Sequence, residues 1–336
     1  MNKQTIYFKN PVIITQTSTI AGPKEGEGPL GKHFDYVLKD DLLKQKSHEH
    51  AEIEIQLRSI RNLLNKAHLG EQDVDCVFGG DLMDEIIGCN FALRETDIPF
   101  LGLYNACATF GESLIIGASM VSAGYFDRVI CTTTSHFATA ERQYRFPLEL
   151  GSQRTPLSQW TVTGAGCALL QKGDTSTAGE VAITCGTIGK VTDYGVTDAN
   201  DMGAVMVPAA MHTLIEHFKD TGREPSYYDL ILTGDLGHAG SRLLQELMKE
   251  KGYDLGDNYS DCGVLIFNRE AQDVVQGGSG ACCSTLVFAG YVYKKLRSGT
   301  LKRVLLVPTG ALLSKTSSLQ GETIPAIAHA VSIEVV

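Results

Sequence analysis

Residues 75–82 read DCVFGGDL, and residues 229–236 read DLILTGDL. Each segment is a short apolar run that follows an aspartate and ends at a glycine and a second aspartate, a pattern typical of a buried β-strand that stops at a turn. Two such similar segments so far apart in one chain indicate an internal repeat, and a repeat constrains the whole fold more than any single element does.

Other matches follow in the same order along the chain. Residues 12–15 (VIIT) resemble residues 181–184 (VAIT), and the pair Ala106-Cys107 recurs at Ala281-Cys282. Predicted strands lie at residues 75–80, 100–104, 128–134, 230–233 and 303–307, and predicted helices at residues 108–123, 242–251 and 284–296. Because strands that alternate with helices form parallel sheets covered on both faces, we predict an α/β fold of two duplicated halves, residues 1–175 and 176–336.

The composition is that of a folded globular protein. The 336 residues are 43% hydrophobic and 20% charged, which excludes a disordered or collagen-like chain. The formal net charge of -10 and the lack of a long basic run argue against nucleic-acid binding and against purely electrostatic docking to a membrane. No run of about 18 apolar residues is present, and the N-terminus does not resemble a signal peptide, so we expect a cytoplasmic type of protein.

The number and spacing of the cysteines also indicate a cytoplasmic type of protein. The nine cysteines are an odd number and contain no CxxC pair, so we expect reduced thiols, most of them in the core. Cys107 differs in its setting, since PFLGLYNACATFGESL places it between a predicted strand and the start of a helix. A helix N-terminus lowers the pKa of a thiol, which makes Cys107 a candidate nucleophile; a small buried core residue is the alternative.

Two glycine-rich turns in the second half are further candidates. His238 lies in DLGHAG, just after a predicted strand, so its imidazole is expected at the carboxyl edge of the sheet, where α/β proteins bind ligands; a histidine on a surface loop is the alternative. Residues 277–284 (GGSGACCS) form a similar turn whose N–H groups suit an anion, although such a turn also occurs without a ligand. We expect Cys282 and Cys283 to be core residues.

The Cys107 segment, DLGHAG and GGSGACCS together resemble the thiolase and ketoacyl-synthase superfamily. The resemblance extends from about Val12 to Val336 and implies a five-layered α/β/α/β/α sandwich of two halves. It also implies a dimer formed through the strand at residues 100–104. Four blocks (NACATFGESL, SQWTVTGAG, DANDMGAVMVPAA and GDLGHAG) are more closely similar to a family of sporulation proteins from spore-forming bacteria.

This resemblance gives Cys107 the nucleophile position and His238 the general-base position. Ser279 stands where the enzymes have a catalytic asparagine, and a hydroxyl cannot span the same gap. The resemblance therefore implies a non-catalytic protein that binds dipicolinic acid (pyridine-2,6-dicarboxylate), as its calcium chelate, for uptake into the developing spore. Two alternatives stay open: an acyltransferase or condensing enzyme that uses Cys107 and His238, and a structural scaffold of a spore membrane complex.

A flat dicarboxylate needs cations, N–H donors and an apolar slot. Lys190, with Asp193 beside it, is one predicted contact, and a solvated loop lysine is the alternative. The remaining predicted ligand contacts, besides Cys107, His238 and Ser279, are Thr134, His136, Arg142 and Arg145, with Arg154 as a further carboxylate clamp. Salt bridges at the surface or at a dimer interface are the alternative role of the three arginines.

We predict no resident cofactor and no metal site. The cluster His48-Glu49-His50 is interpreted as a solvated helix face. Calcium that arrives with the ligand would need carboxylates, and Asp198, Asn200 and Asp201 form a candidate group for it. The segment is not an EF-hand loop, and a helix N-cap and turn is the alternative interpretation. The expected partners are dipicolinic acid, a second copy of the chain and other proteins of the dipicolinate-uptake complex. The expected location is peripheral, at the spore inner membrane, through those proteins.

Overall fold

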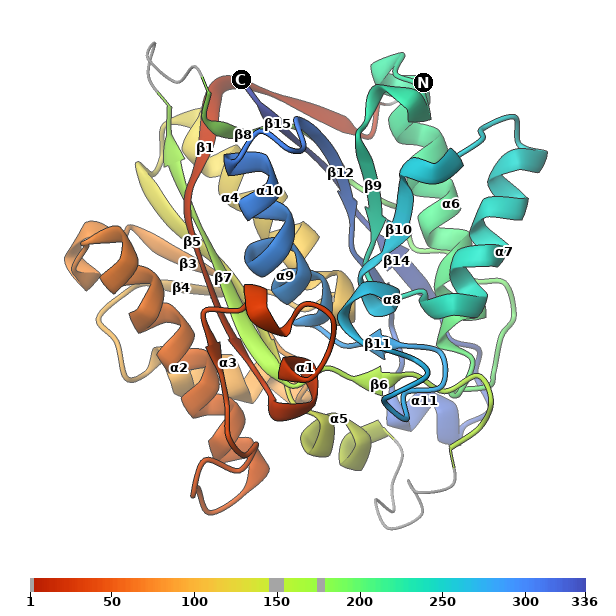
Figure 1. Cartoon of the computed structure of the whole chain (residues 1–336), viewed down its shortest axis with the longest axis horizontal. Helices are drawn as coiled ribbons and strands as arrows, with labels where there is room; N and C mark the ends of the chain where they lie inside the picture. The colour runs from red at the N-terminus through yellow and green to blue at the C-terminus, as the bar shows by residue number, and fades with distance from the viewer. Residues whose placement is uncertain (1–2, 145–153, 174–178) are drawn as a thin grey trace.

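The computed structural model describes residues 3–144, 154–173 and 179–336 (Figure 1). Its main feature is an eleven-stranded sheet. The first half contributes β1 (Thr5–Ala21), β3 (Cys76–Gly80), β4 (Phe100–Gly102), β5 (Arg128–Ser135) and β7 (Gly164–Lys172), with β2 (Tyr36–Val37) beside β1. The second half contributes β8 (Val181–Thr187), β9 (Leu230–Thr233), β10 (Tyr259–Asp261), β12 (Arg303–Val307) and β15 (Ala330–Val335).

The strand order repeats. The sheet runs β4-β3-β5-β7-β1 and then β8-β15-β12-β9-β10. Counted from the outer edge of the sheet toward its centre, the strand order in each half is third, second, fourth, fifth, first, with β2 left out. The directions repeat as well, because β3 is parallel to β4 and β5 as β9 is parallel to β10 and β12. The halves join where β1 pairs antiparallel with β8. The boundary that we predicted at residue 175 falls in residues 174–178, outside the described residues.

Helices form three layers around the two halves of the sheet (Figure 1). The outer helices are α2 (His48–Ala67) and α3 (Ile87–Leu93) on one side, and α6 (Met202–Thr221) and α7 (Gly237–Glu250) on the other. Between the halves lie α4 (Thr109–Ala123), α9 (Cys283–Val287) and α10 (Tyr293–Arg297), the last two joined by a π-helical turn. The predicted α/β/α/β/α layering is confirmed.

Short elements connect the layers. They are α1 (Pro23–Gly26), α5 (Phe137–Tyr144), α8 (Cys262–Ile266), α11 (Lys315–Leu319) and two small strand pairs, β6 (Trp160–Thr161) with β11 (Gly278–Ser279) and β13 (Thr309–Ala311) with β14 (Ala326–Ala328). Helix α5 lies in the connection between β5 and β6.

Helix α4 is the centre of the core. It has small and apolar residues on all sides and no proline, and Leu114 and Ala118 are fully buried between the two halves of the sheet. The segment Ala106–Ala123 is long and apolar enough to cross a membrane, with a mean hydropathy of 1.3, but 67% of it is buried inside the protein. Its composition is thus explained by packing on two faces rather than by contact with lipid.

Candidate functional site

The carboxyl ends of strands from both halves meet around Cys107. After β4 the chain turns through Ala106, which has a φ of 50°, into the short 3-10 turn Ala106–Ala108 and then α4. A non-glycine residue in the left-handed region is strained and is often found where a side chain must be held at a site. The Thr109 hydroxyl stabilises the turn, since it accepts from Asn105 N and donates to the Ala106 carbonyl.

A carboxyl group is the partner of the Cys107 thiol. Burial, the charge of Asp235 and a hydrogen bond from the thiol to the Asp235 carboxylate raise the pKa of Cys107 well above its ordinary value. The Gly280 N–H favours the thiolate, but it is outweighed. The predicted lowering of the pKa is wrong because a helix N-terminus contributes only about 0.3–1 kcal/mol, less than burial beside a carboxylate costs.

Asp235 is itself buried and held by donors from three segments. Besides Cys107, the Thr309 hydroxyl donates to Oδ1 at 2.7 Å and the Gly280 N–H donates to Oδ2 at 3.2 Å. Burial, assisted by the nearby charge of Asp261, nevertheless raises the pKa of Asp235 to about 7. Asp261 accepts from the N–H groups of Leu236 and Gly237 and so fixes the turn that carries Asp235.

His238 does not join this pair. It is the second residue of α7, its N–H donates to the Gln276 carbonyl at 2.9 Å, and the side chain is partly exposed. Burial and the positive charges of Arg269 and Arg242 lower the pKa of its imidazole. Within the described residues no hydrogen bond links His238 to Cys107.

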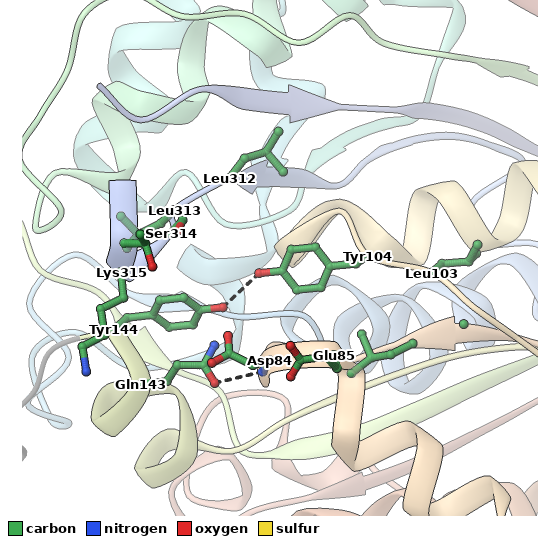
Figure 2. Close-up of a pocket in the computed structure, with 13 residues that line it drawn as sticks. Asp84, Glu85, Leu103, Tyr104, Gln143, Tyr144, Leu312, Leu313, Ser314 and Lys315 are labelled. Atoms are coloured by element: carbon green, nitrogen blue, oxygen red, sulfur yellow. Dashed lines mark hydrogen bonds between the residues drawn. The ribbon is translucent and has the colours of Figure 1, made fainter. Parts of the chain in front are cut away.

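Two cavities lie beside the Cys107 turn. The inner cavity has a volume of about 60 Å³ and is lined by Ala106, Glu141, Ser279 and Gly280, among others. The outer cavity has a volume of about 480 Å³ (Figure 2). Its walls come from the loop after β3, from the end of β4, from α5 and from the start of α11, and include Asp84, Glu85, Tyr104, Gln143, Tyr144 and Lys315.

The cavities share Tyr144 and Leu313. The Tyr144 hydroxyl donates to the Leu82 carbonyl at 2.6 Å and lies 2.9 Å from the Tyr104 hydroxyl, which Figure 2 shows across the outer cavity. Ser279 is therefore placed at the inner cavity as predicted from its turn, whereas Tyr104, Tyr144 and Lys315 line the larger space and were not predicted.

Most of the other predicted contacts lie elsewhere. The Thr134 hydroxyl is buried and donates to the Gly164 carbonyl inside the sheet. Lys190 is exposed near His212, and Asp193 accepts from Gly195 N and the Thr323 hydroxyl at the surface. None of these residues lines the inner or the outer cavity.

The predicted arginines are spread over the neighbouring surface. Arg142 forms an ion pair with Glu49 and lines a third cavity, of about 430 Å³, together with Lys315. Arg154 donates to the Asp273 carbonyl and lies over the Trp160 ring. Arg145 lies outside the described residues.

His136 belongs to a separate polar cluster with Asp41 and His48. Among the described residues, this is the cluster whose side chains lie close enough together to hold a metal ion. Its Nε2 donates to the Asp41 carbonyl at 2.9 Å, and its Nδ1 accepts from Ala138 N at 3.1 Å, so both ring nitrogens are engaged. The arrangement caps α5 and carries no argument for a metal. Asp201 likewise caps α6 through Ala204 N, as the alternative interpretation of that segment predicted.

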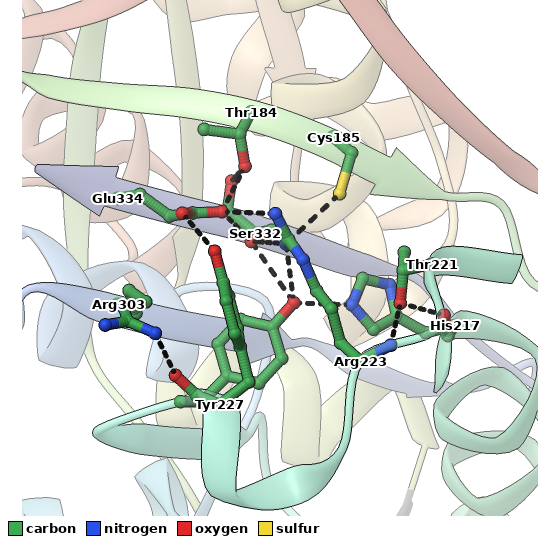
Figure 3. A network of polar contacts seen from close by, with 10 residues as sticks. Thr184, Cys185, His217, Thr221, Arg223, Tyr227, Arg303, Ser332 and Glu334 are labelled. Atoms are coloured by element: carbon green, nitrogen blue, oxygen red, sulfur yellow. Dashed lines mark hydrogen bonds and ion pairs between the residues drawn. The ribbon is translucent and has the colours of Figure 1, made fainter. Parts of the chain in front are cut away.

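A polar network braces the second half away from the site (Figure 3). Arg223 forms a 2.9 Å ion pair with Glu334 and donates to the hydroxyls of Tyr228 and Ser332. Glu334 also accepts from the Thr184 hydroxyl at 2.6 Å. Because Arg223 and Glu334 are only 17% and 12% exposed, this network ties the segment after α6 to β8 and β15.

The fold and the cysteine turn define a thiolase-like protein. The chain is similar to OleA of Xanthomonas campestris, with 14% identity, a TM-score of 0.62 and coverage of 98% of this chain and 99% of that one. It is also similar to 3-oxoacyl-[acyl-carrier-protein] synthase III from Aquifex aeolicus, with 12% identity, a TM-score of 0.54 and coverage of 96% and 99%. At these identities the likeness shows the fold alone.

Sequence similarity is far more specific. The family model described as Stage V sporulation protein AD matches residues 2–334. Stage V sporulation protein AD of Bacillus subtilis (strain 168) is 43% identical over 332 residues, which are 99% of this chain and 97% of that protein. The chain belongs to the stage V sporulation protein AD family.

The sequence contained a signal for one missed residue and none for the others. Asp235 stands in the same GDLGHAG motif as His238, and a carboxylate that ends a buried strand is as well placed to enter a site as the histidine three residues later. Tyr104, Tyr144 and Lys315 lie in segments without a shared motif, and they meet only through the tertiary fold.

Proposed function

We propose that the protein binds dipicolinic acid, as its calcium chelate, for uptake into the developing spore, and that it does so without catalysis. Membership of the stage V sporulation protein AD family supports the role in sporulation. The observation that carries the ligand assignment is the 480 Å³ outer cavity, which is in the size range of small-molecule sites and combines two tyrosine rings with charged groups of both signs.

The charges of the outer cavity favour the chelate over the free dianion. Among the described lining residues, Lys315 is cationic, whereas Asp84 and Glu85 are acidic. A free dicarboxylate would be repelled by the two acidic side chains. In the chelate, calcium offers its open coordination positions to carboxylate oxygens, and the ligand carboxylates remain available to the Lys315 ammonium group.

The Cys107 pair supports a binding role rather than catalysis. A nucleophilic cysteine needs a nearby base and a stabilised thiolate. Here a carboxylate opposes ionisation of the thiol, and Ser279 stands in place of the amide expected in the enzymes. These features work against the acyltransferase alternative, because each of them removes stabilisation of the charged nucleophile or of the transition state.

We also propose a homodimer and attachment to the spore inner membrane through protein partners. Among the described residues, β4 is the last strand of the sheet, so its outer edge is available to pair with a second copy. Leu101 and Tyr104 beside this edge are 49% and 44% exposed, which is high for large apolar side chains. Because Gly102, Leu103 and Tyr104 also line the outer cavity, a partner on this edge would help to enclose the ligand.

Calorimetric titration of the full-length protein tests the ligand assignment. Dipicolinate with equimolar calcium should bind more tightly than dipicolinate alone. Lys315→Met should weaken binding by about tenfold, as expected for loss of one charge-assisted contact. Lys190→Met is the matched control and should bind like the wild type. Absence of heat at millimolar ligand refutes the proposal, and equal affinity with and without calcium refutes the chelate.

A further inference from the structure

We propose that a cavity between α2 and the sheet of the first half binds a small organic anion, in which a phosphate or carboxylate group is joined to an apolar body. This space, which we call the α2 cavity, has a volume of about 380 Å³. Its polar lining residues are Thr15, Gln16, Lys66, Arg128 and Gln171, and three apolar residues complete the wall. None of its lining residues lines the outer, inner or third cavity, so the proposal does not depend on the ligand assigned to the outer cavity.

The α2 cavity lies at the opposite edge of the sheet from Cys107. Strands β3, β4 and β5 are parallel, and both Cys107 and the outer cavity lie beyond the carboxyl ends of β3 and β4. Arg128 is the first residue of β5 and therefore marks the amino end of these strands. Helix α2, which packs against β1 and β7, supplies Lys66 from its last turn (Figure 1).

A β-bulge in β1 directs two consecutive side chains toward the α2 cavity. The register of β1 with β7 shifts between Ile14, opposite Leu170, and Gln16, opposite Leu169, so that Thr15 is an extra residue. Successive side chains of a regular strand point to opposite faces, yet Thr15 and Gln16 both line the cavity. Bulges redirect side chains in this way and are frequent beside functional sites.

Strand pairing holds Arg128 in place with its guanidinium open to a ligand. Arg128 and Gln171 lie opposite each other in β5 and β7, and Arg128 Nε donates to the Gln171 side-chain oxygen at 3.1 Å. Among the described residues Arg128 forms no ion pair, so its outer N–H groups can bind an oxyanion through two parallel hydrogen bonds. The Gln16 side-chain oxygen accepts from Thr17 N at 3.1 Å, which leaves the Gln16 N–H₂ group as a further donor.

Lys66 contributes the second positive charge. Its ammonium group donates to the Thr17 carbonyl at 2.7 Å and to Asp35 at 2.8 Å, which fixes its position and leaves one N–H for a ligand. Asp35 offsets part of the charge but does not line the cavity. Among the described lining residues there are two cations and no carboxylate, although the chain has a net charge of -10. This set of donors favours an anion over a cation or a neutral ligand.

The size and the remaining wall of the α2 cavity indicate an organic ligand. A volume of about 380 Å³ is in the range of sites for small molecules. Ala67, Leu69 and Leu169 provide an apolar surface, and Leu169 is buried within the sheet. The anionic group of the ligand would thus lie at Arg128 and Lys66, and its apolar body against these three side chains.

Ligand-observed NMR with the full-length protein tests the site. The probes are phenyl phosphate and benzoate, which carry the two kinds of anionic group on the same ring. Benzamide is the neutral control, and inorganic phosphate is the control without an apolar body. We expect saturable binding of phenyl phosphate or benzoate, about tenfold tighter than that of either control, and the tighter of the two anions identifies the group that the site prefers.

Variants locate the bound probe. Arg128→Met should weaken binding by about tenfold through loss of the paired hydrogen bonds, and Arg128→Lys should weaken it less because the charge remains. Lys66→Met should weaken binding by about threefold, since Asp35 already offsets part of that charge. Arg61→Met removes an exposed cation of α2 outside the cavity, and Lys315→Met removes the cation of the outer cavity; both should bind the probe like the wild type.

Several results would overturn the proposal. One is the absence of saturable binding of both anions at millimolar concentration, and another is equal binding of benzamide. Unchanged affinity in Arg128→Met, or a loss in Lys315→Met, would place the anion elsewhere, and an equal loss in Arg61→Met would mean unspecific attraction. Inorganic phosphate that binds as tightly as phenyl phosphate would refute the organic body. Thermal melting verifies that each variant is folded, and if Arg128→Met does not fold, Arg128→Lys and Lys66→Met decide the question.

Discussion

Replacement of Asp235 by asparagine tests the electrostatics of the site. The carboxyl has a pKa of about 7 in the folded protein and an ordinary value of 3.8. A pKa that is raised on folding means that the folded state binds the proton more tightly, so stability is full below the ordinary pKa and falls as pH rises from about 4 to about 7. The ionised Asp235 carboxylate therefore destabilises the folded protein at neutral and alkaline pH.

The size of the effect follows from the shift. At about 1.4 kcal/mol per pKa unit, the cost of folding with this carboxyl is about 1.5–2 kcal/mol at pH 5 and about 4 kcal/mol at pH 8. Asparagine does not titrate. It accepts from the Thr309 hydroxyl through its oxygen, but its amide N–H₂ faces the Gly280 N–H, a donor-to-donor contact that costs about 1–3 kcal/mol at every pH.

The pH-independent cost cancels when two pH values are compared. The difference in free energy of unfolding between Asp235→Asn and the wild type should therefore shift in favour of the variant by about 2–3 kcal/mol as the pH is raised from 5 to 8. Urea denaturation followed by circular dichroism, at four pH values across this range, measures the difference directly. The other buried carboxyls that titrate in this range, such as Glu25 with a pKa of about 7, are present in both proteins.

The outcome that would refute the reasoning is a stability difference that stays constant within about 0.5 kcal/mol from pH 5 to pH 8. It would mean that Asp235 keeps an ordinary pKa and that the carboxylate near Cys107 is solvated. The same variant should also lower the pKa of Cys107, since the nearby negative charge is gone, and the pH dependence of iodoacetamide reactivity reports this shift.

Four further experiments have defined outcomes. Glu334→Gln should cost about 3–5 kcal/mol in urea denaturation because it leaves Arg223 without its ion-pair partner in a mostly buried network, whereas Arg297→Met, in an exposed pair, should cost about 0–1 kcal/mol. Gly280→Ala should lower the melting temperature, since φ is +111° and a Cβ would lie 2.9 Å from the Ser135 hydroxyl oxygen. Cys107→Ala should be less stable than Cys107→Ser by about 1 kcal/mol, because only serine keeps a donor to the buried carboxyl. Wild-type protein incubated with acyl-CoA should show no acyl adduct on Cys107 by intact-mass spectrometry, and such an adduct would favour the enzyme alternative.

Much of the fold could be predicted because the repeat is encoded locally. The segments at residues 75–82 and 229–236 become β3 and β9, which occupy the same position in the strand order of their halves. The apolar segment after Cys107 becomes α4, since a helix buried on most sides needs no amphipathic pattern. These features depend on burial and on strand propensity, which the order of residues shows directly.

The site was less accessible to sequence reasoning because it depends on side chains from distant segments. Ser279 lies at the inner cavity and Ala106, next to Cys107, lines it too, but the thiol meets Asp235 rather than His238. A turn that begins a helix carries several polar side chains close together in the sequence. The hydrogen bonds of the turn decide which of these side chains points into the protein. Here Asp261 holds the N–H groups of Leu236 and Gly237, and His238 follows on the partly exposed side of α7.

The contact between Cys107 and Asp235 also gives the cysteine a structural role that needs no reactivity. A buried carboxyl requires donors, and the Cys107 thiol, the Thr309 hydroxyl and the Gly280 N–H supply them from three separate segments. A neutral thiol is a better donor than a thiolate, which has no proton to give, so the raised pKa of Cys107 suits this role as much as it opposes nucleophilic attack. The same residue that would act as nucleophile in an enzyme here helps to join the two halves of the protein, because Cys107 comes from the first half and Asp235 from the second.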